Sequence, residues 1–189
     1  MANLITLSTY KDMKGITSST HDFVLSTLIE SVSQLVKTYC GNSIVDYYAT
    51  NKVEEFTLNW STNVVQLTEV PLNTVVSVEE RTNFSSPYVS LDTSLYYADT
   101  STDSIYKVEN SWPTGLGSVK VTYTAGYSEC PLDLKLAIVD LITYYFKDEH
   151  KSRQTIAGAS LQNQSSSSMA NNIAFPDHIK RVLDLYKTF

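Results

Sequence analysis

The side chains that could take part in acid–base chemistry are few and dispersed. Two pairs of adjacent glutamates occur, Glu54-Glu55 and Glu79-Glu80, each within a segment that alternates like a β-strand. Glycoside hydrolysis requires two carboxylates that converge across a cleft, whereas neighbouring residues of a strand point to opposite faces of the sheet. This spacing separates the members of each pair, so we do not expect a hydrolase site of this kind.

The histidines and cysteines show no metal-binding or nucleophilic pattern. His21, His150 and His178 lie far apart, without HxxxH or HxH spacing, and are typical of solvated helix ends. Cys40 and Cys130 stand singly at expected helix boundaries, which favours reduced thiols and leaves a disulfide as the alternative. Cys130 would lie at a helix N-terminus, where a thiol can become acidic, but no base is near it in the sequence. We predict no catalytic residue, no metal and no cofactor.

The charge balance argues against direct DNA binding. The formal net charge is −6 and the sequence pI is near 5.0, whereas a protein that grips nucleic acid usually has a basic face. DNA could still slide past an acidic surface, because like charges prevent sticking. The N-terminus lacks the pattern of a secretory signal, and no apolar run approaches the ~20 residues of a membrane span. We therefore expect no membrane association.

Two long amphipathic helices frame the chain. The first is predicted at 20–40 and the second at 131–148, where Pro131 suits the first helical position. Each has apolar residues at i, i+3, i+4 and i+7 along one side. The buried side of the second helix is predicted to be Leu134, Ala137, Ile138, Leu141, Ile142 and Tyr145. Since each helix needs a partner for its apolar side, we expect the two to pack together.

The segment between these helices changes to the two-residue period of β-strands and is rich in Val, Ile, Thr and Tyr. Strands are predicted near 44–48, 53–60, 64–67, 74–81, 94–98, 104–108 and 118–124. The fold class is therefore α+β: a small bundle of two long and shorter terminal helices with a large β-rich insertion. The predicted parts are a helical core (1–43 and 119–150), the insertion (44–118), a flexible Ser-rich linker (151–175) and a C-terminal helix (176–189).

Four segments resemble the head–tail connector family of tailed bacteriophages, also called head-completion adaptors. They are LITLSTYKDMKGI, FVLSTLIESVSQLVKTYCGNSI with its Tyr-Cys-Gly ending, WPTGLGSVKVTYTAGYSECPLDLKLAIVDLITYYF, and FPDHIKRVLDLYK. In the third segment, a Trp-Pro turn, a strand, Thr-Ala-Gly-Tyr and a proline precede a long helix. The β insertion looks larger than in minimal members of the family.

This resemblance implies a structural virion protein without enzymatic activity. Such proteins form a homo-oligomeric ring, commonly of twelve subunits, under the portal protein at the head–tail junction. The ring extends the channel through which DNA passes without specific binding, and it offers a platform for a tail, stopper or nozzle protein. The resemblance thus implies a role in viral genome packaging and virus assembly, with assembly in the host cytoplasm.

Two sets of residues are candidates for the contacts of such a ring. The C-terminal helix is too short to be stable alone, so it must dock on its own chain or on another. We predict portal binding by its apolar residues Phe175, Ile179, Val182, Leu183 and Tyr186. Because tyrosine is enriched at interfaces and the long helices have polar flanks, the predicted subunit-interface residues are Tyr144, Gln34, Lys37 and Tyr127.

Two alternatives remain open at this point. The insertion could be a carbohydrate- or surface-binding β module, which an exposed Trp60 or Trp112 in a shallow groove would favour. The chain could instead be a phage hydrolase, which would require a cleft with two convergent carboxylates.

Overall fold

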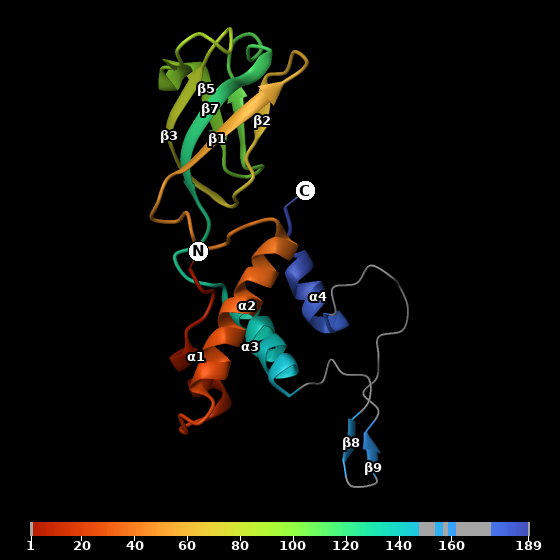
Figure 1. Cartoon of the computed structure of the whole chain (residues 1–189). Coiled ribbons are helices and arrows are strands. Elements are labelled where there is room, and N and C mark those ends of the chain that lie inside the picture. The colour runs from red at the N-terminus through yellow and green to blue at the C-terminus, as the bar shows by residue number, and fades with distance from the viewer. Residues whose placement is uncertain (1, 148–153, 157–158, 162–174, 189) are drawn as a thin grey trace. The chain divides into compact units, whose positions relative to one another are not determined.

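The computed structural model describes residues 2–147, 154–156, 159–161 and 175–188 (Figure 1). The chain divides into two compact units, which we call the β unit (Asn42–Glu129) and the helical unit (Ala2–Gly41 with Cys130–Lys187). Over the described residues the fold is mixed α and β, with four α-helices in the helical unit and two larger antiparallel sheets in the β unit. This agrees with the predicted α+β class.

The helical unit contains all four α-helices, and they form where the apolar periodicity predicts. α1 begins after Thr6, whose hydroxyl accepts a hydrogen bond from the Thr9 amide (3.1 Å), and ends at Gly15, which is left-handed with φ 64°. α2 ends at Gly41 in the same way. The helices are α1 (Leu7–Lys14), α2 (Asp22–Cys40), α3 (Leu132–Phe146) and α4 (Asp177–Asp184).

The apolar sides of these helices meet in one core. α2 contacts α3, and α4 contacts both of them (Figure 1), so the two long helices pack together. Their fully buried positions follow the helical period: Leu25, Ile29, Val32, Val36 and Cys40 on α2, and Leu134, Ile138, Leu141 and Ile142 on α3. The N-terminal segment adds Leu4 and Ile5, and α1 adds Tyr10, whose hydroxyl bonds that of Thr143 (3.1 Å).

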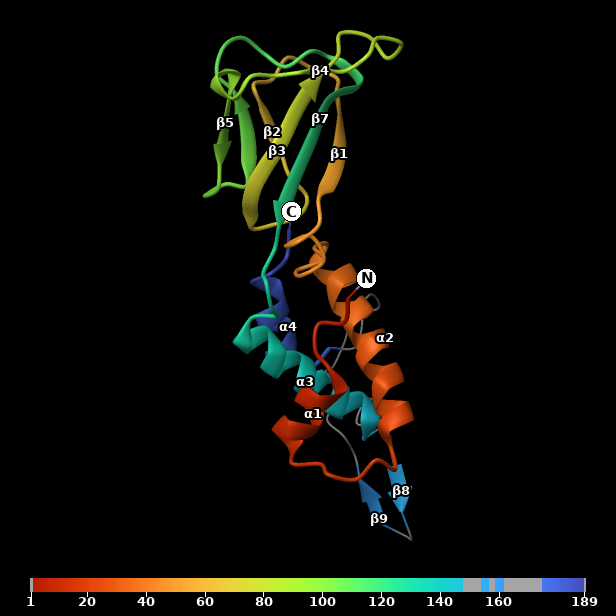
Figure 2. The same cartoon turned by 90° about the vertical axis from the view of Figure 1, so that its left-hand side faces the viewer.

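The β unit is built from two antiparallel sheets (Figure 2). The four-stranded sheet has the order β1-β7-β3-β4, with β1 (Lys52–Leu58), β7 (Gly115–Ala125), β3 (Leu72–Glu80) and β4 (Val89–Ser90). The three-stranded sheet has the order β2-β6-β5, with β2 (Val64–Gln66), β6 (Ser104–Lys107) and β5 (Tyr96–Asp99), the last preceded by the 3-10 helix η1 (Thr93–Leu95).

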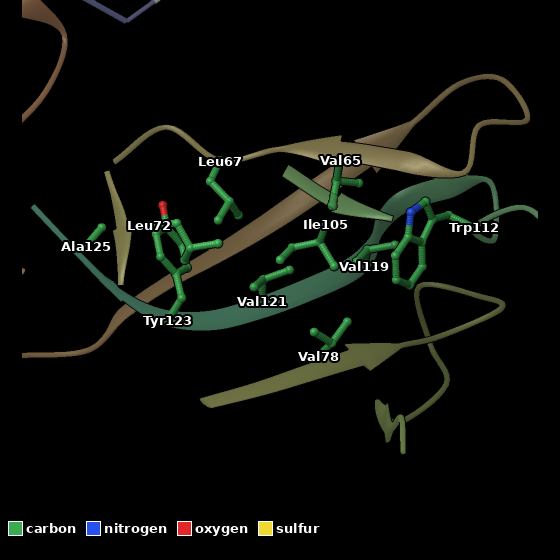
Figure 3. Packing of buried hydrophobic residues seen from close by; sticks show 10 residues of the cluster. All are labelled: Val65, Leu67, Leu72, Val78, Ile105, Trp112, Val119, Val121, Tyr123 and Ala125. Carbon is green, nitrogen blue, oxygen red and sulfur yellow. The ribbon is translucent and has the colours of Figure 1, made fainter. Parts of the chain in front are cut away.

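One hydrophobic cluster lies between the strands of the β unit. Alternate residues of β7 point into it, as the period of two requires, and Val119, Val121 and Tyr123 are fully buried. In Figure 3, Ala125 lies at one end of the cluster and Trp112 at the other. The remaining members are Val65, Leu67, Leu72, Val78 and Ile105.

The structure differs from the sequence prediction at four places. The two-residue strand β4, which pairs with β3, was not predicted. Residues 119–129, predicted with the helical core, belong to the β unit because β7 is hydrogen-bonded on both sides, to β1 and β3. The strand predicted at 44–48 is a turn, in which Ile44 is left-handed (φ 69°). The predicted linker contains two short antiparallel strands, β8 (Gln154–Ile156) and β9 (Ala159–Leu161); the rest of 151–174 lies outside the described residues.

Candidate assembly surfaces

The carboxylate pairs do not form a site. Each carboxylate has its own partner: Glu54 accepts hydrogen bonds from Tyr123 and Thr68, and ion pairs join Glu55 to Arg81, Glu79 to Lys120 and Glu80 to Lys107. These contacts tie neighbouring strands and loops of the β unit together. Within the described residues, no group of His, Cys, Asp and Glu side chains could hold a metal ion. No helix in the same part of the chain is long and apolar enough to cross a membrane.

Neither thiol is part of a disulfide, both are buried, and their environments suppress ionisation. Burial raises the pKa of Cys40 to about 11 and that of Cys130 to about 12, against an ordinary value of 9.0. Cys40 Sγ also lies 3.6 Å from the carbonyl oxygen of Leu183 and donates to it. The position of Cys130 at a helix N-terminus therefore does not produce an acidic, nucleophilic thiol.

Helix α4 is part of the core, which corrects the predicted portal-binding site. Phe175, Ile179 and Leu183 are 5%, 1% and 0% exposed, and the Phe175 ring meets Tyr39 of α2 edge to face, with centroids 5.0 Å apart. Their side chains cannot contact a portal while α4 is packed. A short helix gains stability only from such packing, and its own chain provides it.

The other two predicted portal-binding residues, Val182 and Tyr186, are half-buried. The Tyr186 hydroxyl donates to Asp133 Oδ1 of α3 at 2.6 Å, a hydrogen bond that lowers the pKa of that carboxyl group. The C-terminal end of α4 is thereby tied to the first turn of α3.

The predicted subunit-interface residues fall in different environments. Gln34 is exposed on α2, and Tyr144 is half-buried on α3 with its ring edge to face with Tyr145. Tyr127 is 36% exposed, in the β unit. The prediction that Lys37 lies at a subunit interface is corrected by the structure. Lys37 is 5% exposed, and its Nζ donates to the Ala2 carbonyl oxygen at 2.7 Å. This lysine holds the N-terminal segment against α2, so it is not an available surface charge.

An apolar surface on the helical unit was not predicted. Leu132 and Leu136 of α3 are 81% and 55% exposed, and Leu185, next to Tyr186, is 77% exposed. Leu132 and Leu136 are four residues apart and so lie on one side of the helix; the Tyr186–Asp133 hydrogen bond brings the end of α4 beside them. We call these three leucines the α3–α4 stripe. The signal in the sequence was that Leu132 and Leu136 fall outside the buried series of α3.

A second apolar surface lies at one end of the β unit, where β1 and β3 end and β7 begins. We call this end, made by loops 59–63, 82–88 and 110–118, the tip. It exposes three large hydrophobic side chains: Trp60 (71%), Phe84 (68%) and Leu116 (64%). The loops are joined to each other, because the Trp112 amide donates to the Thr62 carbonyl (2.8 Å) and the hydroxyls of Ser61 and Ser111 are 2.6 Å apart.

Arg81, at the end of β3, fixes two of the three loops. Its guanidinium donates to the carbonyl oxygens of Phe84 (3.1 Å), Leu116 (3.3 Å) and Gly117 (2.9 Å). The same group lies over the rings of Phe84 and Tyr88, 4.6 and 4.4 Å from their centroids. Gly117 is left-handed (φ 54°), and a Cβ there would approach Arg81 Nη2 to 2.5 Å. The tip is therefore a rigid arrangement of loops.

The two tryptophans near the tip differ completely in exposure. Trp112 is 1% exposed and packs in the hydrophobic cluster, with Lys107 Nζ 5.3 Å from its ring centroid. It cannot line a groove for a ligand, so of the two tryptophans that would have favoured a surface-binding module only Trp60 is accessible.

A family model described as "head completion protein" matches residues 3–189 of this chain. The chain belongs to the head completion protein family. The match spans both units, so the β unit is part of the family's chain. No curated protein sequence matches this one.

Solved structures share the fold of this head completion protein. A chain in the neck of an empty gene transfer agent particle, computed with C6 symmetry, aligns with TM-score 0.62 at 12% identity over 98% of this chain and 90% of that chain. A chain in the neck of the native particle, computed with C12 symmetry, aligns with TM-score 0.59 at 14% identity over 100% and 96%. A chain of the native gene transfer agent virion gives TM-score 0.62 at 14% identity over 98% and 90%.

Proposed function

We propose that this head completion protein is a structural head–tail connector subunit of a tailed phage or phage-like particle. Twelve copies form a ring at the junction of head and tail, between the portal and the next tail component, and the ring surrounds the channel for DNA. The observation that carries the proposal is the family match over 3–189. Fold similarity to neck chains, one in a neck computed with C12 symmetry, supports the location and the ring.

The chemistry of the described residues is consistent with a structural role. Each carboxylate of the two adjacent pairs has its own hydrogen-bonding or ion-pair partner, and the thiols are buried with raised pKa values. The net charge of −6 suits a channel wall past which DNA moves without binding. Assembly in the host cytoplasm would precede attachment to the head.

A ring requires two different surfaces that meet between neighbouring copies. We propose that the α3–α4 stripe is one of them, since it presents Leu132, Leu136 and Leu185 on packed helices. Tyr144 of α3, Gln34 of α2 and Tyr127 of the β unit are proposed to lie beside the contacts between subunits. Val182, half-buried on α4, remains a candidate contact to the portal.

The test uses heads from a particle that lacks this protein. Purified wild-type protein is added to these heads, unbound protein is removed by sedimentation, and the portal vertex is imaged by electron microscopy. We expect a ring of added density at that vertex. A Leu132→Ser/Leu136→Ser variant should bind with fewer copies per head, whereas Thr27→Ser, an exposed change on α2, should bind normally. Wild-type protein that stays monomeric and ignores the heads would contradict the proposal.

A further inference from the structure

The three loops of the tip contain no charged residue, although the chain is acidic; the charged groups beside them, Arg81 and Glu55, form an ion pair. Its three loops read NWSTN (59–63), TNFSSPY (82–88) and NSWPTGLGS (110–118). Charged residues make up 18% of the chain, so the 21 positions of these three segments taken together would ordinarily include several. Depletion of charge together with exposed aromatic residues is the composition of the centre of a protein–protein interface.

The tip is also ordered before any partner arrives. Arg81 is largely buried (11% side-chain exposure) and holds the backbone carbonyls of Phe84 and Leu116. Binding loses affinity when it must order flexible loops, and here the protein's own hydrogen bonds have already ordered them. The exposure of Trp60, Phe84 and Leu116 is thus a property of a fixed surface.

We propose that the tip is the docking surface for a different protein of the particle, one that presents an uncharged, apolar surface in many copies around the same axis. This inference rests on the proposed function. The partner's surface over the loops is expected to be uncharged and apolar, because the loops carry no charge and the two charged groups beside them, Arg81 and Glu55, pair with each other. Three side chains of this size cover on the order of 400 Å², about half of the roughly 800 Å² per partner in a standard interface.

A contact this small would be weak between two monomers. This favours an interface in which both this protein and its partner form rings. When many copies engage at once, each later contact is effectively intramolecular, and avidity replaces single-contact affinity. A second copy of this chain does not meet the requirement as well, because a tip-to-tip pair would be closed by only two weak patches.

The tip is poorly suited to a sugar or to DNA. A sugar site needs several polar groups aimed at the ligand hydroxyls, but the Ser61 and Ser111 hydroxyls bond each other and the Thr62 hydroxyl donates to the Val64 carbonyl oxygen. Phe84 and Leu116 offer no hydrogen bonds. DNA binding requires cations, and loops 59–63, 82–88 and 110–118 contain none.

The experiment joins heads and tails in vitro, with heads and tails from a particle that lacks this protein. The tested variant is Trp60→Ser/Phe84→Ser/Leu116→Ser, which alters exposed side chains only. The control is Val53→Thr/Val76→Thr, which changes two exposed valines of β1 and β3 (56% and 54%) away from the tip. Co-sedimentation with heads and with tails, and the yield of joined particles, are measured separately. Circular dichroism and Trp112 fluorescence verify the fold of each variant.

We expect the tip variant to lose binding to one of the two assemblies at least tenfold, to keep binding to the other, and to reduce joined particles at least tenfold. The control should behave as wild type. Normal joining by a folded tip variant would overturn the inference while leaving the proposed function intact, whereas failure of wild-type protein to bind heads would overturn the proposed function itself. Binding of the wild-type tip to a glycan array or to phosphatidylcholine vesicles, lost in the variant while joining stays normal, would assign the tip to another class of partner.

Discussion

The packing of α4 can be tested with one substitution, Leu183→Ala. Leu183 is fully buried between α4 and the long helices, and its backbone carbonyl accepts from Cys40. Truncating a fully buried leucine costs about 2–5 kcal/mol, from lost transfer free energy and from the cavity that remains. We expect Leu183→Ala to lower the free energy of unfolding by about 3 kcal/mol. Ile179→Val, which removes one methylene group from a 1%-exposed side chain, should cost about 1 kcal/mol.

The two units allow this loss to be located. Both tryptophans of the chain, Trp60 and Trp112, lie in the β unit, so tryptophan fluorescence reports its unfolding. The described α-helices all lie in the helical unit, so the helical band of the circular dichroism spectrum reports the unfolding of the helical unit. With a urea m value of about 1–1.5 kcal/mol/M, Leu183→Ala should lower the midpoint of the helical transition by roughly 2–3 M and leave the fluorescence transition in place.

Leu185→Ala is the matched control, since Leu185 directly follows α4 and is 77% exposed. A surface change of this kind should alter stability by less than about 0.5 kcal/mol. If Leu183→Ala and Leu185→Ala behaved alike, α4 would not be packed on α2 and α3. The reasoning that removed Phe175, Ile179 and Leu183 from the portal-binding surface would then fail.

Three further predictions concern single contacts. Gly126→Ala should lower the stability of the β unit by at least about 2 kcal/mol in the fluorescence transition, because φ is 92° and a Cβ would lie 2.3 Å from the Ile44 carbonyl oxygen; an unchanged midpoint would contradict it. Arg81→Ala should cost the same unit roughly 2–3 kcal/mol and speed proteolysis at 82–88, with little rescue by Lys, which lacks the planar fork. Burial raises the pKa values of Cys40 to about 11 and Cys130 to about 12, so between pH 9 and 11 the unfolded thiols ionise while the folded ones stay neutral. The helical unit should then lose about 1.4 kcal/mol per pH unit for each thiol, and a Cys40→Ala/Cys130→Ala variant should show a shallower loss.

The helices were predictable because their burial repeats with the helical period. Leu134, Ile138, Leu141 and Ile142 of α3 were predicted as a buried side and are 0% exposed. Six strands of the β unit were predicted to within a few residues from alternation, whereas β4 was not predicted and the strand predicted at 44–48 is a turn. The boundary of the unit was not predicted either. Residues 119–129 were assigned to the helical core because they directly precede the second long helix in the sequence. In the structure, β7 belongs to the β unit because it is hydrogen-bonded to β1 and β3, which lie far from it in the sequence.

The surfaces were harder to predict than the elements. The apolar spacing on α4 predicts that one side of the helix is buried, but it does not show whether that side packs against the same chain or another protein. In the structure, Ile179 and Leu183 pack against their own chain. Lys37 looked like a surface charge because lysine is rarely buried; its side chain instead reaches the Ala2 carbonyl. The tip depends on Arg81, which bonds backbone up to 36 residues away, and a sequence pattern does not display such a contact.

The rigidity of the tip and the symmetry of a ring reinforce each other. A contact of roughly 2 kcal/mol corresponds to a dissociation constant of about 30 mM, which is negligible for a monomer. In a ring the same contact is repeated, but any cost of ordering loops is repeated as well, so flexible loops would cancel the gain at each copy. Arg81→Ala leaves Trp60, Phe84 and Leu116 in place yet removes the hydrogen bonds that order two of their loops. If preorganisation matters as argued, this variant should reduce joined particles about as strongly as losing one of the three apolar side chains; joining at the wild-type yield would show that their exposure alone suffices.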